Sequence, residues 1–283
     1  MHKETCAILD NKKVAPGHWV LKLRSRAIAK AALPGQFVQV LCADDSFDPL
    51  LPRPFSFLSA QNDVFSILHQ VVGKGTELLS KKKKGDTLRV LGPLGNGFTL
   101  RPQVKAKKAV LVGGGVGIPP LYHLTETLLK NKILKPNEIS IYLGARNKSL
   151  LLCEKEFKKM KVSLFLATDD GSKGHKGFIT ELLSRGLQSP ASGPSSQIYT
   201  CGPTPMLKAV SVISVKFNVS CEVSVEVPMA CGFGACLGCA IKVRSAAKND
   251  GPRVVSAAKG ENFRFAIACT EGPVFKASEL IWD

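Results

Sequence analysis

Three cysteines, Cys231, Cys236 and Cys239, lie in the segment ACGFGACLGC at 230–239. Their spacing, C-x4-C-x2-C, is typical of plant-type [2Fe–2S] sites, which a fourth, distant cysteine completes. A structural zinc site is the alternative, but it favours two C-x2-C pairs. The glycines between the cysteines allow a tight loop whose backbone N–H groups point at sulfur. The segment therefore predicts an iron–sulfur cluster, and Cys269 is the only cysteine that follows it.

The composition predicts a cytoplasmic protein with metal or redox chemistry. The chain has nine cysteines in 283 residues and no apolar N-terminal stretch for secretion, so its cysteines favour metal binding over disulfides. We expect no membrane span, since no apolar run is long enough. The formal net charge of +17 suggests an acidic protein partner. Nucleic acid is disfavoured because Lys81–Lys84 form the only basic block.

The hydrophobic pattern changes twice along the chain. Residues 1–100 carry short apolar runs with period-two alternation, broken by Gly and Pro, which predicts an antiparallel β-sandwich or β-barrel. Residues 101–217 alternate buried strands with helices, which is typical of an α/β domain with a parallel sheet. Residues 218–283 contain the cysteine loop and a tail punctuated by Gly and Pro. We therefore expect an α+β protein of three domains with these bounds.

A glycine-rich turn opens the second helical pattern of the chain, in AVLVGGGVGIPPL at 109–121. Glycines allow close backbone approach, and a helix N-terminus offers free N–H groups to a phosphate. The strict G-x-G-x-x-G pattern is absent, because Pro120 stands where the third glycine is expected. The turn favours dinucleotide binding, with a tight strand–helix connection as the alternative.

Two further short segments have the chemistry of a flavin site. The segment RPFS at 53–56 offers an arginine for a pyrophosphate, a flat ring and a hydroxyl, and GKGT at 73–76 precedes a helix that Thr76 can cap. An arginine ion pair on the rim of a barrel explains RPFS equally well. The five histidines show no ligand spacing, and no hydrolytic triad is evident.

The order of the motifs carries a family resemblance over nearly the whole chain. The segments RPFS, GKGT, LGPLGNGF, GGGVGIPPL, TDDGSKGHKGF, YTCGP, EVPMACGFGACLGC and ACTEGPVF follow one another. The chain closely resembles the electron-transfer subunits of NAD-linked dihydroorotate dehydrogenases, a branch of the ferredoxin-reductase-like flavoproteins. The resemblance implies an FAD-binding β-barrel at 1–100, an NAD-binding α/β domain at 101–217 and a [2Fe–2S] lobe at 218–283.

The resemblance also implies roles for particular residues. The implied FAD residues are Arg53, Pro54, Phe55, Ser56, Leu68, His69, Gln70, Gly75 and Thr76. The implied NAD residues are Gly114, Gly115, Gly117, Cys201, Gly202 and Pro203. Cys201 is a possible catalytic thiol near the nicotinamide, with a small buried core residue as the alternative. The implied cluster ligands are Cys231, Cys236, Cys239 and Cys269.

Two positions depart from the family pattern. Phe55 stands where many relatives in the wider superfamily carry tyrosine, so a flat face remains without a phenolic hydrogen bond. The 29 residues between Cys239 and Cys269 form a longer gap than many members have, and its segment 244–264 is expected to be a basic surface loop.

The implied function is electron transfer. Electrons from the FMN of a separate dihydroorotate dehydrogenase subunit pass through a [2Fe–2S] cluster and FAD to NAD⁺, in pyrimidine (UMP) biosynthesis, with two copies of each subunit. Alternatives are the flavin and iron–sulfur subunit of another NAD(P)H-linked complex, such as a ferredoxin–NADP reductase or a hydrogenase, and a non-catalytic zinc-binding relative. Arg146, after the second strand of the α/β pattern, is the candidate reader of a 2′-phosphate if NADP is used.

Overall fold

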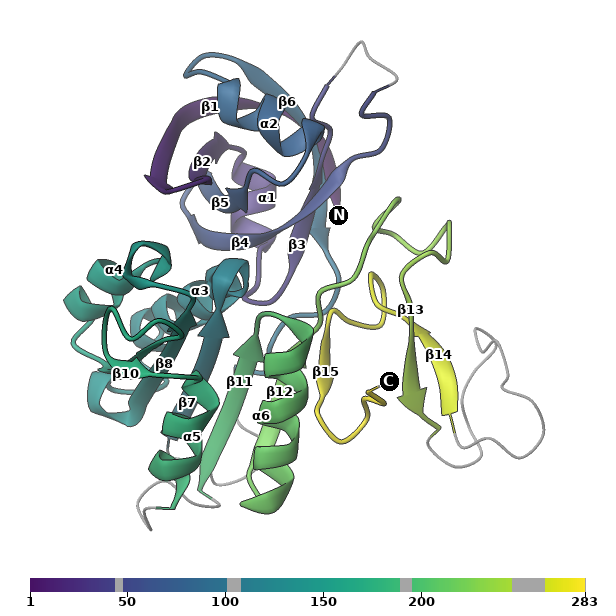
Figure 1. Cartoon of the computed structure of the whole chain (residues 1–283). Helices are drawn as coiled ribbons and strands as arrows, with labels where there is room; N and C mark the ends of the chain where they lie inside the picture. The colour runs from purple at the N-terminus through teal and green to yellow at the C-terminus, as the bar shows by residue number, and fades with distance from the viewer. Residues whose placement is uncertain (44–47, 101–107, 189–194, 246–262, 283) are drawn as a thin grey trace.

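The computed structural model describes residues 1–43, 48–100, 108–188, 195–245 and 263–282. It has an N-terminal barrel, a central sheet covered by helices, and a small C-terminal lobe beside both (Figure 1). This three-part α+β architecture confirms the expected fold class. No helix in the described ranges is both long and apolar enough to cross a membrane.

The N-terminal barrel is closed by six antiparallel strands in the order β1-β2-β5-β4-β3-β6. Their bounds are β1 His2–Ala15, β2 His18–Arg24, β3 Phe37–Val40, β4 Arg53–Gln61, β5 Val64–Gln70 and β6 Thr87–Leu94. Two helices accompany the barrel, α1 Arg26–Ala31 and α2 Lys74–Lys81, and the Ser25 side chain caps α1 by accepting a hydrogen bond from the Ile28 N–H. Barrel closure leaves no free sheet edge.

The two faces of β3 have different surroundings. Val38 and Val40 are fully buried in the barrel core with Phe57 and Phe65. Because side chains alternate along a strand, Phe37 and Gln39 point to the opposite face. Phe37 packs in a second core that contains residues of the cysteine lobe. The barrel wall at β3 therefore separates the barrel interior from the C-terminal lobe.

The central sheet has seven strands in the order β10-β9-β8-β7-β11-β12-β15. The bounds are β7 Lys108–Gly114, β8 Ile139–Ala145, β9 Ser163–Thr168, β10 His175–Lys176, β11 Ser196–Cys201, β12 Ser220–Ser224 and β15 Val274–Lys276. All neighbours are parallel except β12 and β15. Parallel strands need crossover connections, which the helices supply.

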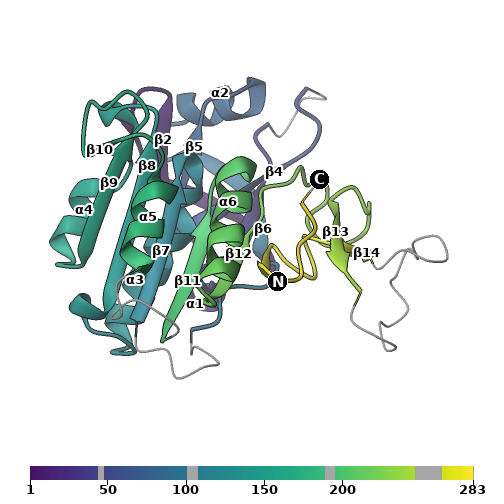
Figure 2. The same cartoon turned by 60° about the horizontal axis from the view of Figure 1, so that its bottom comes forward.

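Helices cover both faces of this sheet. They are α3 Ile118–Lys130, α4 Glu154–Lys159, α5 Ile179–Leu187 and α6 Thr204–Lys216, with short 3-10 turns at Gly115–Gly117, Pro136–Glu138 and Lys148–Leu150. The helices α5 and α6 share one face (Figure 2). Helix α3 lies on the other face, against β4 of the barrel, and joins the barrel and the sheet in one apolar cluster.

The C-terminal lobe is built on the antiparallel pair β13 Ala240–Arg244 and β14 Phe263–Ile267. The segment 218–283 expected as a separate lobe also contributes β12 and β15 to the central sheet. Strand β12 pairs with β11 and β15, and its Val223 is fully buried in the core that the sheet shares with the lobe. Most of the expected surface loop at 244–264 lies outside the described residues.

Candidate functional site

A cleft of about 300 Å³ opens between the barrel, the glycine-rich turn and the start of the cysteine lobe. This volume is at the lower end of the range of small-molecule pockets. Of the residues expected to bind FAD or NAD, the cleft is lined by Arg53, Pro54, Phe55, Ser56, Leu68, His69, Gln70, Thr76, Gly117 and Cys201. Residues from three distant parts of the sequence therefore meet at one surface.

The barrel side of the cleft is formed by the neighbouring strands β4 and β5. Arg53 begins β4, and its Nη1 donates to the carbonyl of Leu51 at 2.7 Å. The ring of Phe55 meets the His69 ring edge to face, with centroids 5.9 Å apart. The sheet pairing thus presents a guanidinium and two flat rings to the cleft, which suits a phosphorylated aromatic ligand.

His69 is the buried polar group that fits a ligand in this cleft. It is 1% exposed, and neither ring nitrogen has a hydrogen-bond partner among the described residues. Burial, and secondarily the charge of His18, lowers the pKa of His69 to about 4. A buried ring with unmatched nitrogens is costly, so a flavin ring edge that pairs with either nitrogen would remove that cost.

Helix α2 uses Thr76 differently from the expected cap. The helix begins at Lys74, so Thr76 lies in its first turn rather than before it. The Thr76 hydroxyl accepts from the Val72 and Gly73 N–H groups at 2.9 and 3.2 Å and donates to the Gly73 carbonyl at 2.9 Å. Gly75 does not line the cleft, but a methyl added there would lie 3.6 Å from Cγ of Arg53. The first turn of α2 therefore lies close to Arg53.

On the opposite wall, the glycine-rich turn packs against the end of β11. A methyl on Gly117 would lie 2.4 Å from the backbone of Cys201. Gly202 has φ +156, and a methyl there would lie 2.6 Å from Cε of Met206. A methyl on Gly114 would lie 3.1 Å from Sδ of Met206 and 3.4 Å from Cδ of Pro203. Of the six residues expected to bind NAD, only Gly117 and Cys201 line the cleft itself; Gly115, with φ +55 and open space around it, extends the turn.

Cys201 lies at the carboxyl end of β11, 7% exposed. Burial raises the pKa of its thiol to about 12, against a smaller opposing hydrogen bond with Ser224. The thiol is therefore neutral at physiological pH, which argues against a nucleophile and suits a small, uncharged wall of a nicotinamide pocket.

The segment 224–229 lines the cleft and was missed by the sequence analysis. It contributes Ser224, Val225, Glu226, Val227 and Met229. Burial raises the pKa of Glu226. The signal that could have found these residues is their position directly before the first cysteine, because a chain that links two redox sites has to pass close to both.

The four expected cluster cysteines form two neighbouring pairs. Cys236 donates its N–H to Cys231 Sγ at 3.5 Å, and the thiols of Cys239 and Cys269 are close enough for one to shift the pKa of the other. Backbone N–H groups also point at sulfur: Gly234 donates to Cys269 Sγ at 3.1 Å, and the Cys269 N–H donates to Cys239 Sγ at 3.4 Å. In the described ranges no three His, Cys, Asp or Glu side chains are gathered closely enough to hold one metal ion. Two thiol pairs suit two irons, each held by two cysteines.

The loop polarises its thiols to different extents. Burial by itself raises the pKa of Cys231, but the N–H groups of Cys236, Phe233 and Ala235 outweigh it and bring the pKa down to about 6. Burial, and then the neighbouring Cys239 thiol, raises the pKa of Cys269 to about 12. A bound iron keeps all of its cysteine ligands deprotonated, and the converging N–H groups stabilise the thiolates that it requires.

A second groove lies on the outer side of the cysteine loop. It runs between Cys231, Phe233 and Cys236 of the loop and the barrel strands that carry Lys3 and Arg89. Cys236 is exposed, and the side chains of Phe233 and Leu237 are 49% and 54% exposed. The outer side of the cysteine loop therefore lies at the molecular surface, and Met229, which lines the cleft, lies directly before the loop.

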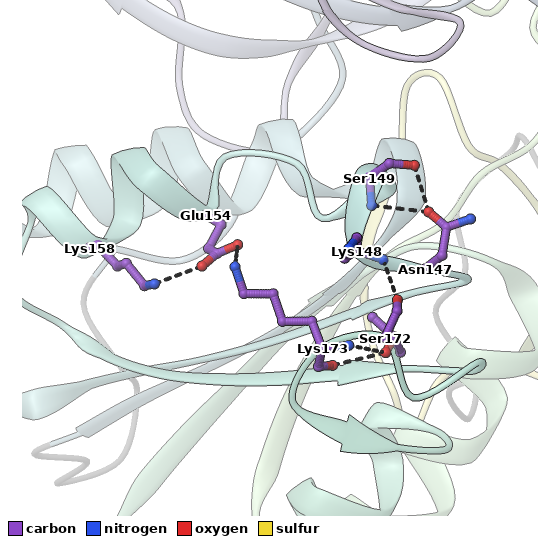
Figure 3. A network of polar contacts seen from close by, with 8 residues as sticks. Asn147, Lys148, Ser149, Glu154, Lys158, Ser172 and Lys173 are labelled. Carbon is purple, nitrogen blue, oxygen red and sulfur yellow. Dashed lines mark hydrogen bonds and ion pairs between the residues drawn. The ribbon is translucent and has the colours of Figure 1, made fainter.

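Arg146 follows β8 and is exposed. The residues directly after it, Asn147–Ser149, belong to a polar network (Figure 3). There Glu154 accepts from both Lys158 and Lys173, and the Lys148 N–H donates to Ser172 Oγ. The Asp170 N–H donates to the Arg146 carbonyl at 3.3 Å, which places a carboxylate residue next to the candidate 2′-phosphate reader. Backbone and side-chain hydrogen bonds thus tie the loops after β8 and β9 together.

Two family models match the chain. Residues 111–212 match the oxidoreductase NAD-binding domain, and residues 226–281 match the iron–sulfur cluster binding domain of dihydroorotate dehydrogenase B. The first range starts in β7 and ends in α6, and the second contains all four expected cluster cysteines.

Full-length relatives have a common description. The chain is 39% identical, over 95% of each chain, to the electron transfer subunit of dihydroorotate dehydrogenase B (NAD(+)) from Desulforamulus reducens. It is 36% identical, over 99% of each chain, to the subunit of the same description from Caldanaerobacter subterraneus subsp. tengcongensis.

Solved structures share the fold. A chain of an NADH-dependent reduced ferredoxin-NADP oxidoreductase, studied for flavin-based electron bifurcation, matches with a TM-score of 0.80 at 30% identity, over 99% of this chain and 91% of that chain. The ferredoxin reductase of carbazole 1,9a-dioxygenase matches with a TM-score of 0.65 at 22% identity, over 77% of this chain and 66% of that chain.

Proposed function

Because this chain belongs to the family of electron transfer subunits of NAD-linked dihydroorotate dehydrogenase B, we propose that it passes electrons from a catalytic dihydroorotate dehydrogenase subunit to NAD⁺. The resemblance seen in the sequence is confirmed. The electrons come from the FMN of the catalytic subunit as dihydroorotate is oxidised to orotate in pyrimidine (UMP) biosynthesis. Two copies of each subunit form a heterotetramer. Its place is the cytoplasm, where cysteines stay reduced, and the nine cysteines of this chain are free.

The observation that carries the proposal is the continuity between the cleft and the cysteine loop. Met229 lines the cleft, and Cys231, two residues later, lines the outer groove. A flavin held by Arg53, Phe55 and His69 would thus share the cleft with Met229, which is two residues before the first cluster ligand. The turn at Gly117 and Cys201 would hold the nicotinamide at the opposite wall.

The chain's own residues then have distinct tasks. When bound, the cluster carries single electrons, whereas the flavin exchanges one or two and so matches the cluster to a hydride acceptor. Arg53 supplies a fixed pair of donors for phosphate oxygens, and the neutral Cys201 thiol leaves room for a flat ring. The N–H groups of the cysteine loop hold the thiolates. Phe233 and Leu237 cover the loop without enclosing Cys236, so electrons can enter from a docked partner.

The partner docks on the outer groove, where exposed apolar side chains lie beside basic residues. Phe233 offers an apolar anchor, and Lys3 and Arg89 flank it. The +17 charge of the chain adds long-range attraction for an acidic partner face.

Reversing the charge at the groove is expected to slow association. Lys3→Glu should lower the association rate constant with the catalytic subunit by roughly two- to tenfold at low salt, because rim charges act on encounter. The difference should shrink as salt screens the charges. Stopped-flow mixing at several ionic strengths measures it. Lys155→Glu, an equal charge change on exposed α4, is the matched control; equal rates for both variants, or a salt-independent rate for the wild type, would contradict an electrostatic docking groove.

The function is tested on the anaerobically purified chain and on its complex. Flavin, iron and sulfide are assayed on one sample, and its visible spectrum is recorded before and after NADH. We expect flavin bands and iron–sulfur absorbance that both bleach. In the complex with a catalytic subunit, dihydroorotate should then reduce NAD⁺.

The outcomes separate the candidate functions. Bleaching by NADH without any response to dihydroorotate would favour a subunit of another NAD(P)H-linked complex, as the match to the ferredoxin-NADP oxidoreductase chain allows. A colourless chain that contains zinc would overturn electron transfer altogether. A comparison of NADH with NADPH in the same assay tests whether Arg146 reads a 2′-phosphate.

A further inference from the structure

We propose that Gln39 is the positioning residue that fixes the first cluster ligand, Cys231, relative to the flavin cleft. This inference rests on the proposed function. Gln39 lies in β3, whose sequence is FVQV, and it is the only polar residue of that strand. It is 2% exposed, on the same face as Phe37.

The Gln39 side chain contacts the backbone on both sides of Cys231. Its Nε2 donates to the carbonyl of Met229 at 3.1 Å, two residues before the cysteine. Directly after the cysteine, Gly232 has φ +83, and a methyl there would lie 2.6 Å from Cγ of Gln39. The loop therefore packs on this side chain two residues before and one residue after its first ligand.

The same amide connects this ligand to the flavin cleft. Gln39 is the cross-strand partner of Pro54, which lines the cleft with Met229. Gln39 itself lines the outer groove together with Cys231 and Cys236. It is thus the side chain that spans the wall between the two sites.

The orientation of the amide is fixed by its one hydrogen bond. Nε2 has to face the Met229 carbonyl, because an oxygen there would meet another acceptor. Oε1 is then buried without a hydrogen-bond partner among the described residues. Leaving a buried acceptor unpaired lowers the stability of the fold. An apolar side chain at position 39, like that of Phe37 on the same face, would avoid this cost. A tolerated cost at this position indicates that the donor is needed.

As a consequence, the position of Cys231, and with it that of the cluster, depends on strand β3 of the barrel. Outer partners orient metal ligands, and their loss typically lowers metal affinity or activity about 10- to 100-fold. Hydrogen bonding and solvent exposure around the sulfurs also set the reduction potential of a cluster. Loss of the Gln39 donor should therefore loosen Cys231 and leave hydride transfer on the other wall of the cleft unaffected.

The test is Gln39→Met in the loaded chain, since methionine keeps the length of glutamine and cannot donate. We expect release of iron to a chelator about 10-fold faster than in the wild type. The electron paramagnetic resonance spectrum of the reduced cluster should change, and flavin-to-cluster electron transfer after NADH should slow, whereas flavin reduction by NADH stays the same. Gln197→Met is the matched control, because Gln197 is a 5% exposed amide on β11 with only a backbone contact at 3.3 Å.

Two results would overturn the proposal. One is a Gln39→Met chain whose cluster spectrum, release rate and electron-transfer rate equal those of the wild type and of Gln197→Met. The other is loss of flavin together with the cluster in both Gln39→Met and Gln39→Glu, which would make Gln39 a general core residue. Loss of the cluster alone, with flavin retained, would support it. A wild-type chain without a cluster would instead refute the proposed function, so the two failures are distinguishable.

Discussion

Replacing Cys269 with alanine is expected to remove the iron–sulfur cluster and to abolish NAD⁺ reduction by dihydroorotate in the complex. Cys269 is 1% exposed, its thiol pairs with that of Cys239, and the Gly234 N–H points at its sulfur. A [2Fe–2S] cluster needs four ligands, and no other cysteine follows the loop in the sequence. Iron and sulfide assays and the visible spectrum measure the loss.

The flavin side should survive this substitution. Cys269 lines neither wall of the flavin cleft, so FAD content and reduction of FAD by NADH should remain. Cys221→Ala, at a 5% exposed cysteine in β12, is the control and should keep its iron. A Cys269→Ala chain with full iron content would show that another group completes the site.

Replacing Gly117 with alanine is expected to slow the reduction of FAD by NADH. Gly117 has an ordinary φ of −78, so its need for glycine is purely spatial. The new methyl would lie 2.4 Å from the carbonyl carbon and oxygen of Cys201, which are backbone atoms and cannot rotate away. Overpacking costs about 1–3 kcal/mol, which corresponds to roughly 5- to 150-fold in an equilibrium constant. Rapid mixing with NADH, followed by flavin absorbance, measures the rate.

A strained glycine outside the site controls for general destabilisation. Gly85 has φ +96 and open space around it, in the turn before β6, so Gly85→Ala adds backbone strain without a collision. A left-handed alanine costs about 1–2 kcal/mol. The prediction fails if FAD in Gly117→Ala is reduced by NADH as fast as in the wild type. It also fails if Gly85→Ala has the same unfolding midpoint as Gly117→Ala and slows the reduction of FAD equally.

Most elements of the fold could be predicted from local patterns. The strands β2, β8 and β9 and the helices α3 and α6 carry the hydrophobic pattern of their kind and lie in the regions expected for the β unit and the α/β unit. Strand β1 lacks such a pattern. Only Cys6 and Ile8 of its side chains are buried, so the alternation in HKETCAILDNKKVA is too weak to read. Its pairing with β2 and β6 comes from barrel closure.

The sequence by itself determined the chemistry of the sites. The spacing of Cys231, Cys236 and Cys239 predicts a cluster loop, because cysteines on one short loop stay close enough in space to share a cluster. The glycine run at 113–117 likewise predicts a tight turn from its own residues, although the contact that requires glycine at 117 is made by the distant Cys201. These features depend on neighbours along the chain, which a sequence displays directly.

Only the tertiary structure decided which distant residues meet them. The 29-residue gap before Cys269 left its role open in the sequence. Pairing of Ala240 with Ile267 between β13 and β14 brings Cys269 back to Cys239. The contact of Gln39 with the cysteine loop, 190 residues away along the chain, has no sequence signal. Such contacts depend on how the barrel packs against the lobe, and packing is a property of surfaces that only the folded chain brings together.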